Sequence, residues 1–171
     1  MFREMRLKRQ ALDEGACREI LKDGSIGVLS VAGDDGYPYG VPLNYVYDEQ
    51  AGKIYFHSAR DGHKLDAIRR EPKVSFCVVG KNQLVPEEFT TYFTSVIAFG
   101  RATVLTDDRE REAALRLLSE KYVKAPKERV DAEIAKSFPA VGLVELAIEH
   151  LSGKQAIELV QEDRRQADLP L

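Results

Sequence analysis

The sequence lacks the features that mark secreted, membrane-spanning and disulfide-rich proteins. Its two cysteines, Cys17 and Cys77, stand in no CxxC arrangement, which predicts reduced thiols rather than a disulfide framework or a zinc site. The first fifteen residues are charged and contain no apolar core, so we expect no signal peptide. No stretch approaches the ~18 apolar residues of a membrane-spanning helix. These absences predict a cytoplasmic protein without a membrane anchor.

The chain also has no excess of basic residues. It contains 25 Lys and Arg against 28 Asp and Glu, a formal net charge of -3, whereas nucleic-acid binding requires a basic face. A chain of 171 residues most simply forms one domain, since domains usually have about 100–200 residues. It can bury roughly 70% of its unfolded surface without help from a metal or disulfide. We expect one domain over residues 1–171 that binds no nucleic acid.

Common catalytic and nucleotide-binding signatures are absent as well. The sequence contains no GxGxxG, GxxxxGK[ST], HExxH or GxSxG motif. Its histidines have no cysteines at the spacing of metal ligands. His57 and His63 with Asp61 are the one alternative, but a metal site normally needs three or four converging ligands. We therefore predict no metal.

Strand patterns dominate what is present. Antiparallel strands need only short turns between them, and closing such a sheet removes its exposed edges. The prediction is a mainly β fold with helices, an antiparallel barrel. The expected strands cover residues 25–31, 37–47, 53–58, 74–79, 91–105 and 141–148, and the expected helices cover residues 13–22, 64–70, a segment from Thr106 onward, and 127–137.

Some local patterns predict which residues face the core. In the first strand, Ile26 and Val28 are expected to point inward, with Val31 as a further candidate. Residues 80–88 show no period and predict a loop. The polar tail, residues 161–171, is expected to fray.

Proline and glycine mark special places in two strands. Pro42 cannot donate a ladder hydrogen bond, so its strand is expected to be an edge or to carry a bulge. Gly100 lies inside the longest strand and predicts a bend or a close backbone approach, as barrels require.

Residues 54–76 carry the densest set of ligand-binding groups. A strand leads into the polar turn His57 to Lys64, which offers hydroxyl, imidazole and cationic donors, and Gly62 allows close backbone approach. Lys64 starts a short helix, where free N–H groups and the helix dipole attract an anion. The turn is a coherent phosphate site, although a solvated surface turn explains the same residues equally well.

Polar residues also interrupt two apolar strands. Asn44 lies in an apolar run, and Ser95 follows Thr91 and Thr94 in the longest strand. A buried Asn or Ser needs a hydrogen-bond partner. That partner is either the protein backbone or the edge of a bound heterocycle.

Four segments together resemble a known family. They are GVLSVAGDDGYPYGVPLNYVYD, KIYFHSARDGHKLDAIRREPKVSFCVVG, TSVIAFGRATVL and IEHLSGKQAIEL, and they span about Ser25 to Leu159. In this order they are similar to the flavin-binding split barrels related to pyridoxamine 5'-phosphate oxidase, and within them to the Nim-type nitroimidazole-resistance proteins. The most specific segment is FHSAxxGHKLDxIRRxPKVSF.

The resemblance implies a split β-barrel homodimer with FMN at the subunit interface. It implies that the turn handles the FMN phosphate and ribityl chain, and so favours binding over a plain surface turn. Some members of the family bind haem or a deazaflavin instead, and the role of Arg60 in the turn stays open. The cofactor-binding residues implied by the resemblance are His63 and Lys64 at the phosphate, His57, Ser58, Ala59 and Gly62 in the same turn, Pro42, Leu43, Asn44 and Tyr45 along the isoalloxazine ring, and Ser95 and Val96 from the long strand.

The implied activity is that of an FMN-dependent oxidoreductase. A reduced nicotinamide would load the flavin, and a small aromatic acceptor such as a nitroimidazole would unload it. No catalytic residue stands out, although His63 could donate a proton as well as bind phosphate. Residues 85–92 lie where variation facing the substrate is expected. Two alternatives remain: a barrel that holds flavin or haem without turnover, and a structural barrel with an empty cleft.

Overall fold

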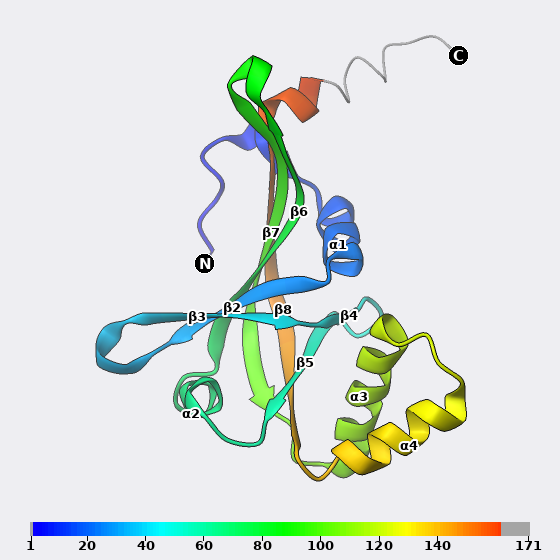
Figure 1. The fold of residues 1–171 in the computed structure, drawn as a ribbon. Coiled ribbons are helices and arrows are strands. Elements are labelled where there is room, and N and C mark those ends of the chain that lie inside the picture. Colours follow the sequence, from blue (N-terminus) through cyan, green and yellow to red (C-terminus); the bar gives the residue numbers. More distant parts are fainter. Residues whose placement is uncertain (1, 162–171) are drawn as a thin grey trace.

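A computed structural model describes residues 2–161, and its strands form one antiparallel sheet surrounded by helices (Figure 1). This confirms the predicted mainly β class. Most of the predicted frayed tail, residues 162–171, lies outside the described residues. No helix within residues 2–161 is long and apolar enough to cross a membrane. The strands are β1 (Ala11–Leu12), β2 (Ile26–Ala32), β3 (Pro38–Asn44), β4 (Val46–Asp48), β5 (Lys53–Ala59), β6 (Lys73–Val85), β7 (Thr90–Val104) and β8 (Val141–Gln155), and the α-helices are α1 (Glu14–Asp23), α2 (His63–Arg70), α3 (Asp108–Tyr122) and α4 (Lys127–Ser137).

One residue of the chain links the two end strands of this sheet, and so gives the sheet the form of a barrel. The strand order is β3-β2-β6-β7-β8-β5-β4, with β1 added on β8, so β3 and β4 stand at its two ends. Only Tyr45 separates them in the chain. The single strand predicted over residues 37–47 is therefore two strands, because the chain leaves the partner β2 and joins β5. Pro42 lies in β3, an end strand of this order, as its missing donor predicted.

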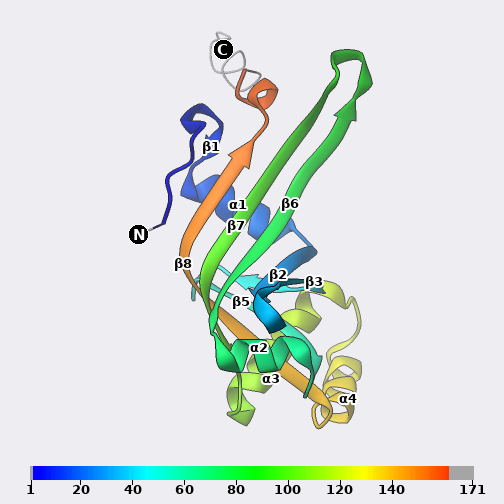
Figure 2. The same ribbon diagram turned by 90° about the vertical axis from the view of Figure 1, so that its left-hand side faces the viewer.

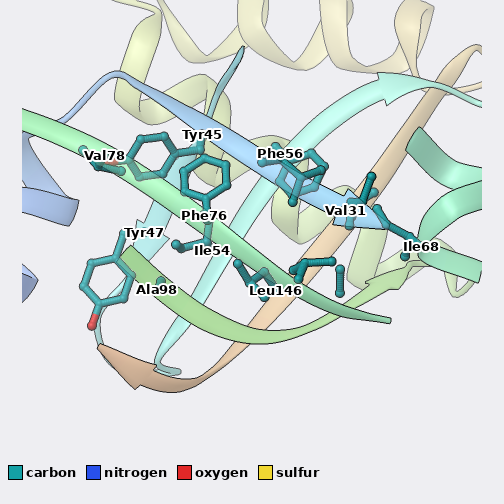
Figure 3. Close-up of a cluster of buried hydrophobic side chains, with 14 of the residues drawn as sticks. Val31, Tyr45, Tyr47, Ile54, Phe56, Ile68, Phe76, Val78, Ala98 and Leu146 are labelled. Atoms are coloured by element: carbon teal, nitrogen blue, oxygen red, sulfur yellow. The ribbon is translucent and has the colours of Figure 1, made fainter. Parts of the chain in front are cut away.

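The main core fills the barrel. Tyr45, Phe56 and Phe76 are fully buried there, and Figure 3 shows their rings together. Two helices also pack against this core: α2 buries Leu65 and Ile68 in it, and α1 buries Cys17 and Leu21. Burial raises the pKa of the Cys17 thiol to about 11, so this cysteine is an inert core residue.

A second core lies between α3, α4 and the outside of the barrel. Leu115 and Leu118 of α3 and Ile134 of α4 pack with Leu143 of β8. Arg111 is only 6% exposed, and its guanidinium donates to the carbonyl oxygens of Phe138 and Val141, each at 3.0 Å. The two helices thus cover one outer face of the barrel, beside β4, β5 and β8.

Of the three residues of β2 expected to point inward, Val31 is confirmed, and Ile26 and Val28 are wrong. Ile26 is 58% exposed and Val28 39%, whereas Leu29 and Val31 are buried. Side chains alternate along a strand, so a shift of one residue moves the whole set to the other face. Gly27 occupies an inward position against Phe76, and its missing side chain hides the true phase of the pattern.

The loop predicted for residues 80–88 is also wrong for residues 80–85, whereas residues 86–88 form a short 3-10 turn at the hairpin tip. β6 continues to Val85 and pairs with β7 down to Thr90, with a register shift between Val79 and Asn82. This long hairpin extends beyond the barrel (Figure 2). Its tip buries neither face, and Leu84 and Phe89 are 71% and 97% exposed. Without a buried face there is no apolar alternation to read, although the backbone ladder still forms.

Candidate functional site

The polar turn leads from β5 directly into the start of α2. Gly62 adopts φ 128°, a conformation that favours glycine, and is the N-cap residue of α2. Its carbonyl accepts from the amides of Leu65 and Asp66, but no side chain caps the helix. The first amide groups of α2 are thus left without a side-chain acceptor, which is the arrangement that binds anions.

Lys64 adds a cation beside these amides. It is half-buried, and no carboxylate of residues 2–161 lies within ion-pair distance of its amine. His57 and Ala59 are exposed, and the Ser58 hydroxyl donates to the Ala59 carbonyl at 2.7 Å. Arg60, whose role the sequence left open, donates to the Pro139 carbonyl at 2.9 Å and so links the turn to the segment before β8.

The His63 ring is held by residues that sequence reasoning missed. It stacks on Tyr39 of β3, with ring centroids 4.2 Å apart, and its Nε2 lies 3.3 Å from Asp34 Oδ2. Asp34 also accepts from Arg70, at the other end of α2, at 3.1 Å. Asp34 looked like part of an ordinary hairpin turn, and no local pattern predicts contacts with a helix some thirty residues later. The structure therefore brings β3 and the turn together through Tyr39 and His63.

The residues expected along a flavin ring are only partly accessible. Pro42 and Asn44 are exposed, and Leu43 is partly buried. The side chains of Tyr45 and Val96 are fully buried in the barrel core, so neither side chain is accessible to a ligand. The Asn44 amide donates to the Ser25 carbonyl at 2.9 Å, which is the backbone alternative for this polar residue.

Ser95 and Val96 do not join the turn within one chain. The amide of Ala102, further along β7, donates to the carbonyl of Pro72, just after α2. Roughly 23 Å of extended strand separates Ser95 from Ala102, at about 3.3 Å for each residue. The resemblance assigns Ser95, Val96 and the turn to the same cofactor. Within one chain, however, Ser95 and Val96 lie at the end of β7 that is remote from α2.

Tyr122 of α3 braces the point where the barrel closes. Its hydroxyl lies 2.6 Å from the carbonyl oxygen and 3.2 Å from the amide of Tyr45, and 2.7 Å from the Ser25 carbonyl. Lys121 donates to the Gly24 carbonyl at 2.5 Å and lies over the Tyr45 ring, and burial lowers the pKa of its amine. The end of α3 therefore ties the β3–β4 junction at Tyr45 to the segment just before β2.

Removing the Tyr122 hydroxyl should weaken this closure. We expect Tyr122→Phe to lower the free energy of unfolding by about 1–3 kcal/mol, because the partly buried amide of Tyr45 loses its acceptor. Urea unfolding measures the difference. Tyr37→Phe is the control, since Tyr37 is 75% exposed and should change stability little. Equal unfolding midpoints for the two variants would contradict the bracing role.

Within residues 2–161 no group of three or more His, Cys, Asp or Glu could hold a metal ion. The alternative of His57 and His63 with Asp61 therefore has no support in the geometry. The groups that the turn offers are amides, an amine and an imidazole, which are the groups that suit an anion rather than a metal.

Most of the chain, including this turn, lies within the match to a known protein family. A family model described as pyridoxamine 5'-phosphate oxidase matches residues 13–155, and the chain therefore belongs to this family. This confirms the resemblance seen in the sequence. A search of curated proteins finds no match.

Solved structures with the same fold include proteins of several descriptions. A candidate 5-nitroimidazole antibiotic resistance protein from Bacteroides thetaiotaomicron is 20% identical with a TM-score of 0.71, and the match covers 85% of this chain and 86% of that one. An FAD-binding protein from Mesorhizobium loti is 25% identical with a TM-score of 0.62, over 86% and 97% of the two chains. A conserved hypothetical protein from Mycobacterium tuberculosis is 16% identical with a TM-score of 0.76, over 99% and 95%.

Proposed function

We propose that this protein is a flavin-dependent oxidoreductase that binds FMN, with the phosphate at the turn His57 to Lys64. The observation that carries the proposal is the uncapped start of α2 beside Lys64, in a barrel of the pyridoxamine 5'-phosphate oxidase family. A phosphate at a helix start is stabilised by the amide groups and by the helix dipole. The FAD-binding relative from Mesorhizobium loti supports a flavin as the ligand class.

Each part of the candidate site has a distinct task in this proposal. Lys64 and His63 hold the phosphate, and the backbone of the turn lies along the ribityl chain. β3 pairs with β2 on one side, so its other edge offers backbone donors and acceptors near Pro42 to Asn44 for a heterocycle. The flavin supplies the hydride and electron chemistry when bound, and the chain supplies orientation and charge.

A second copy of the chain completes the proposed site. Ile26, Val28 and Val79 are exposed apolar residues on β2 and β6, strands that pair with each other. A homodimer through this face would bury these side chains and bring Ser95 and Val96 of one copy to the cofactor of the other. We propose this arrangement for a cytoplasmic enzyme that takes electrons from a reduced nicotinamide and passes them to a small aromatic acceptor, such as a nitroimidazole.

The absorbance spectrum of the purified protein, before and after addition of FMN, is the decisive test. We expect bound flavin in a 1:1 ratio, followed by bleaching when a reduced nicotinamide is added without oxygen and by reoxidation with a nitroimidazole or a quinone. A flavin that binds but is never reduced would make the protein a binding module. A haem spectrum, or no bound chromophore after reconstitution, would refute the proposal.

A further inference from the structure

Asp34 uses both of its carboxylate oxygens to connect the β2–β3 turn to α2. Oδ1 accepts from Arg70 Nη1 at 3.1 Å, and Oδ2 lies 3.3 Å from His63 Nε2. Arg70 also donates to the carbonyls of Ala32 and Gly33, at 2.9 and 3.0 Å. The Asp34 carboxylate therefore contacts His63, the first residue of α2. Arg70, the last residue of α2, holds the β2–β3 turn in place.

Two different contacts restrict the His63 imidazole. The contact with Asp34 fixes one edge of the ring, and the stack on Tyr39, at an interplanar angle of 13°, fixes its face. A histidine that is 41% exposed would otherwise sample several rotamers. With Nε2 facing the Asp34 carboxylate, the ring nitrogen left for a ligand is Nδ1, and within residues 2–161 the ring's other close contact is the stack on Tyr39.

The charge balance of this cluster is compatible with a nearby anion. Asp34 alone would repel a phosphate, but Arg70 pairs with it directly. An imidazolium donates from both ring nitrogens. It can therefore satisfy the Asp34 carboxylate through Nε2 and a phosphate oxygen through Nδ1 at the same time.

We propose that Asp34 and Tyr39 are positioning residues that orient the His63 imidazole so that Nδ1 binds the phosphate of the flavin. This inference rests on the proposed function. Neither residue needs to touch the ligand: Asp34 holds Nε2 on the side of the ring away from the ligand, and Tyr39 fixes the plane of the ring. Asp34 and Tyr39 thus restrict the rotamers of the His63 side chain before the ligand binds, so that binding does not have to immobilise it.

The expected effect on affinity is moderate. Immobilising a flexible side chain on binding costs about 0.5–1.5 kcal/mol, which corresponds to a loss of about two- to tenfold in affinity when the restraint is removed. The loss should be confined to ligands that carry the phosphate. FMN and riboflavin differ by that group alone, so the pair separates positioning at the phosphate from a general effect on the fold.

The test compares Asp34→Asn and Tyr39→Leu with the wild type in the full-length protein. An amide offers one acceptor oxygen where Arg70 and His63 each need one, and leucine removes the stacked ring. The controls are Asp35→Asn, the same change one residue later, and Tyr39→Phe, which keeps the ring. Flavin fluorescence quenching gives the affinities for FMN and riboflavin, and nitrogen-15 NMR of the His63 ring reports which nitrogens carry protons.

We expect both test variants to bind FMN about two- to tenfold more weakly than the wild type and to bind riboflavin with unchanged affinity. Both should also show a changed NMR signal from the His63 ring. The controls should match the wild type in all three measurements. Unchanged or tighter FMN binding would overturn the inference, as would an equal loss for FMN and riboflavin, which indicates a purely structural role. A wild type that bound neither flavin would refute the proposed function itself.

Discussion

Replacing Gly100 with alanine is expected to destabilise the barrel by about 3 kcal/mol or more. A Cβ at this position would lie 2.0 Å from the carbonyl oxygen of Ala147 and 2.9 Å from its carbonyl carbon. Both atoms belong to the backbone of β8, so they cannot move aside as a flexible side chain can. The β7–β8 register also shifts between Phe99 and Gly100, and the two strands come too close there for any side chain.

Urea unfolding of Gly100→Ala against Gly40→Ala tests this prediction. Gly40 also lies in a strand, β3, but a Cβ there would meet only Val28 Cγ1, at 3.4 Å, an ordinary van der Waals distance. We expect the Gly40 variant to stay within about 1 kcal/mol of the wild type. If both variants unfolded at the same urea concentration, the close approach at Gly100 would not be a constraint on the fold.

Replacing Lys64 with alanine should produce the largest effect on the ligand. A hydrogen bond to a charged group contributes about 1.5–3 kcal/mol, so the variant should bind FMN about 10- to 100-fold more weakly. Riboflavin affinity should not change, because Lys64 is assigned to the phosphate. The free energy of unfolding should stay that of the wild type, since Lys64 forms no ion pair with a carboxylate within residues 2–161 that the substitution would remove.

Lys136→Ala is the matched control for Lys64→Ala. Lys136 carries the same charge on α4 and makes an exposed contact with Glu133 at 3.8 Å, so its removal should leave FMN affinity unchanged. Equilibrium dialysis or fluorescence quenching at fixed ionic strength compares the two, which separates a local phosphate contact from the loss of one positive charge. Wild-type FMN occupancy in the Lys64 variant would remove this side chain from the site.

Much of the architecture could be predicted because it follows from local patterns. The strand-to-helix turn at His57 to Lys64 is visible in residue order alone, and α2 begins one residue before the predicted start. Pro42 marked an edge strand through its missing amide, and Gly100 marked a close approach through its missing side chain. Each of these depends on the chemistry of one residue within its own element.

The predictions that were wrong depended on what surrounds an element. The faces of β2 could not be assigned because Gly27 occupies a core position without a side chain. The single strand over residues 37–47 is divided at Tyr45, since closing the barrel requires it to pair first with β2 and then, through β4, with β5. The hairpin of β6 and β7 has no buried face at its tip, so its sequence carries no period.

Local sequence patterns were enough to predict the class of fold, the turn before α2 and the donor groups that this turn carries. These follow from backbone sterics, hydrogen-bonding groups and short-range order, which neighbouring residues control. Three features needed the folded chain: Asp34 and Tyr39 hold His63, Tyr122 braces Tyr45, and Ser95 lies far along β7 from the end that meets α2. These contacts join residues separated by tens of positions, and they form only when the closing barrel brings distant strands and helices together.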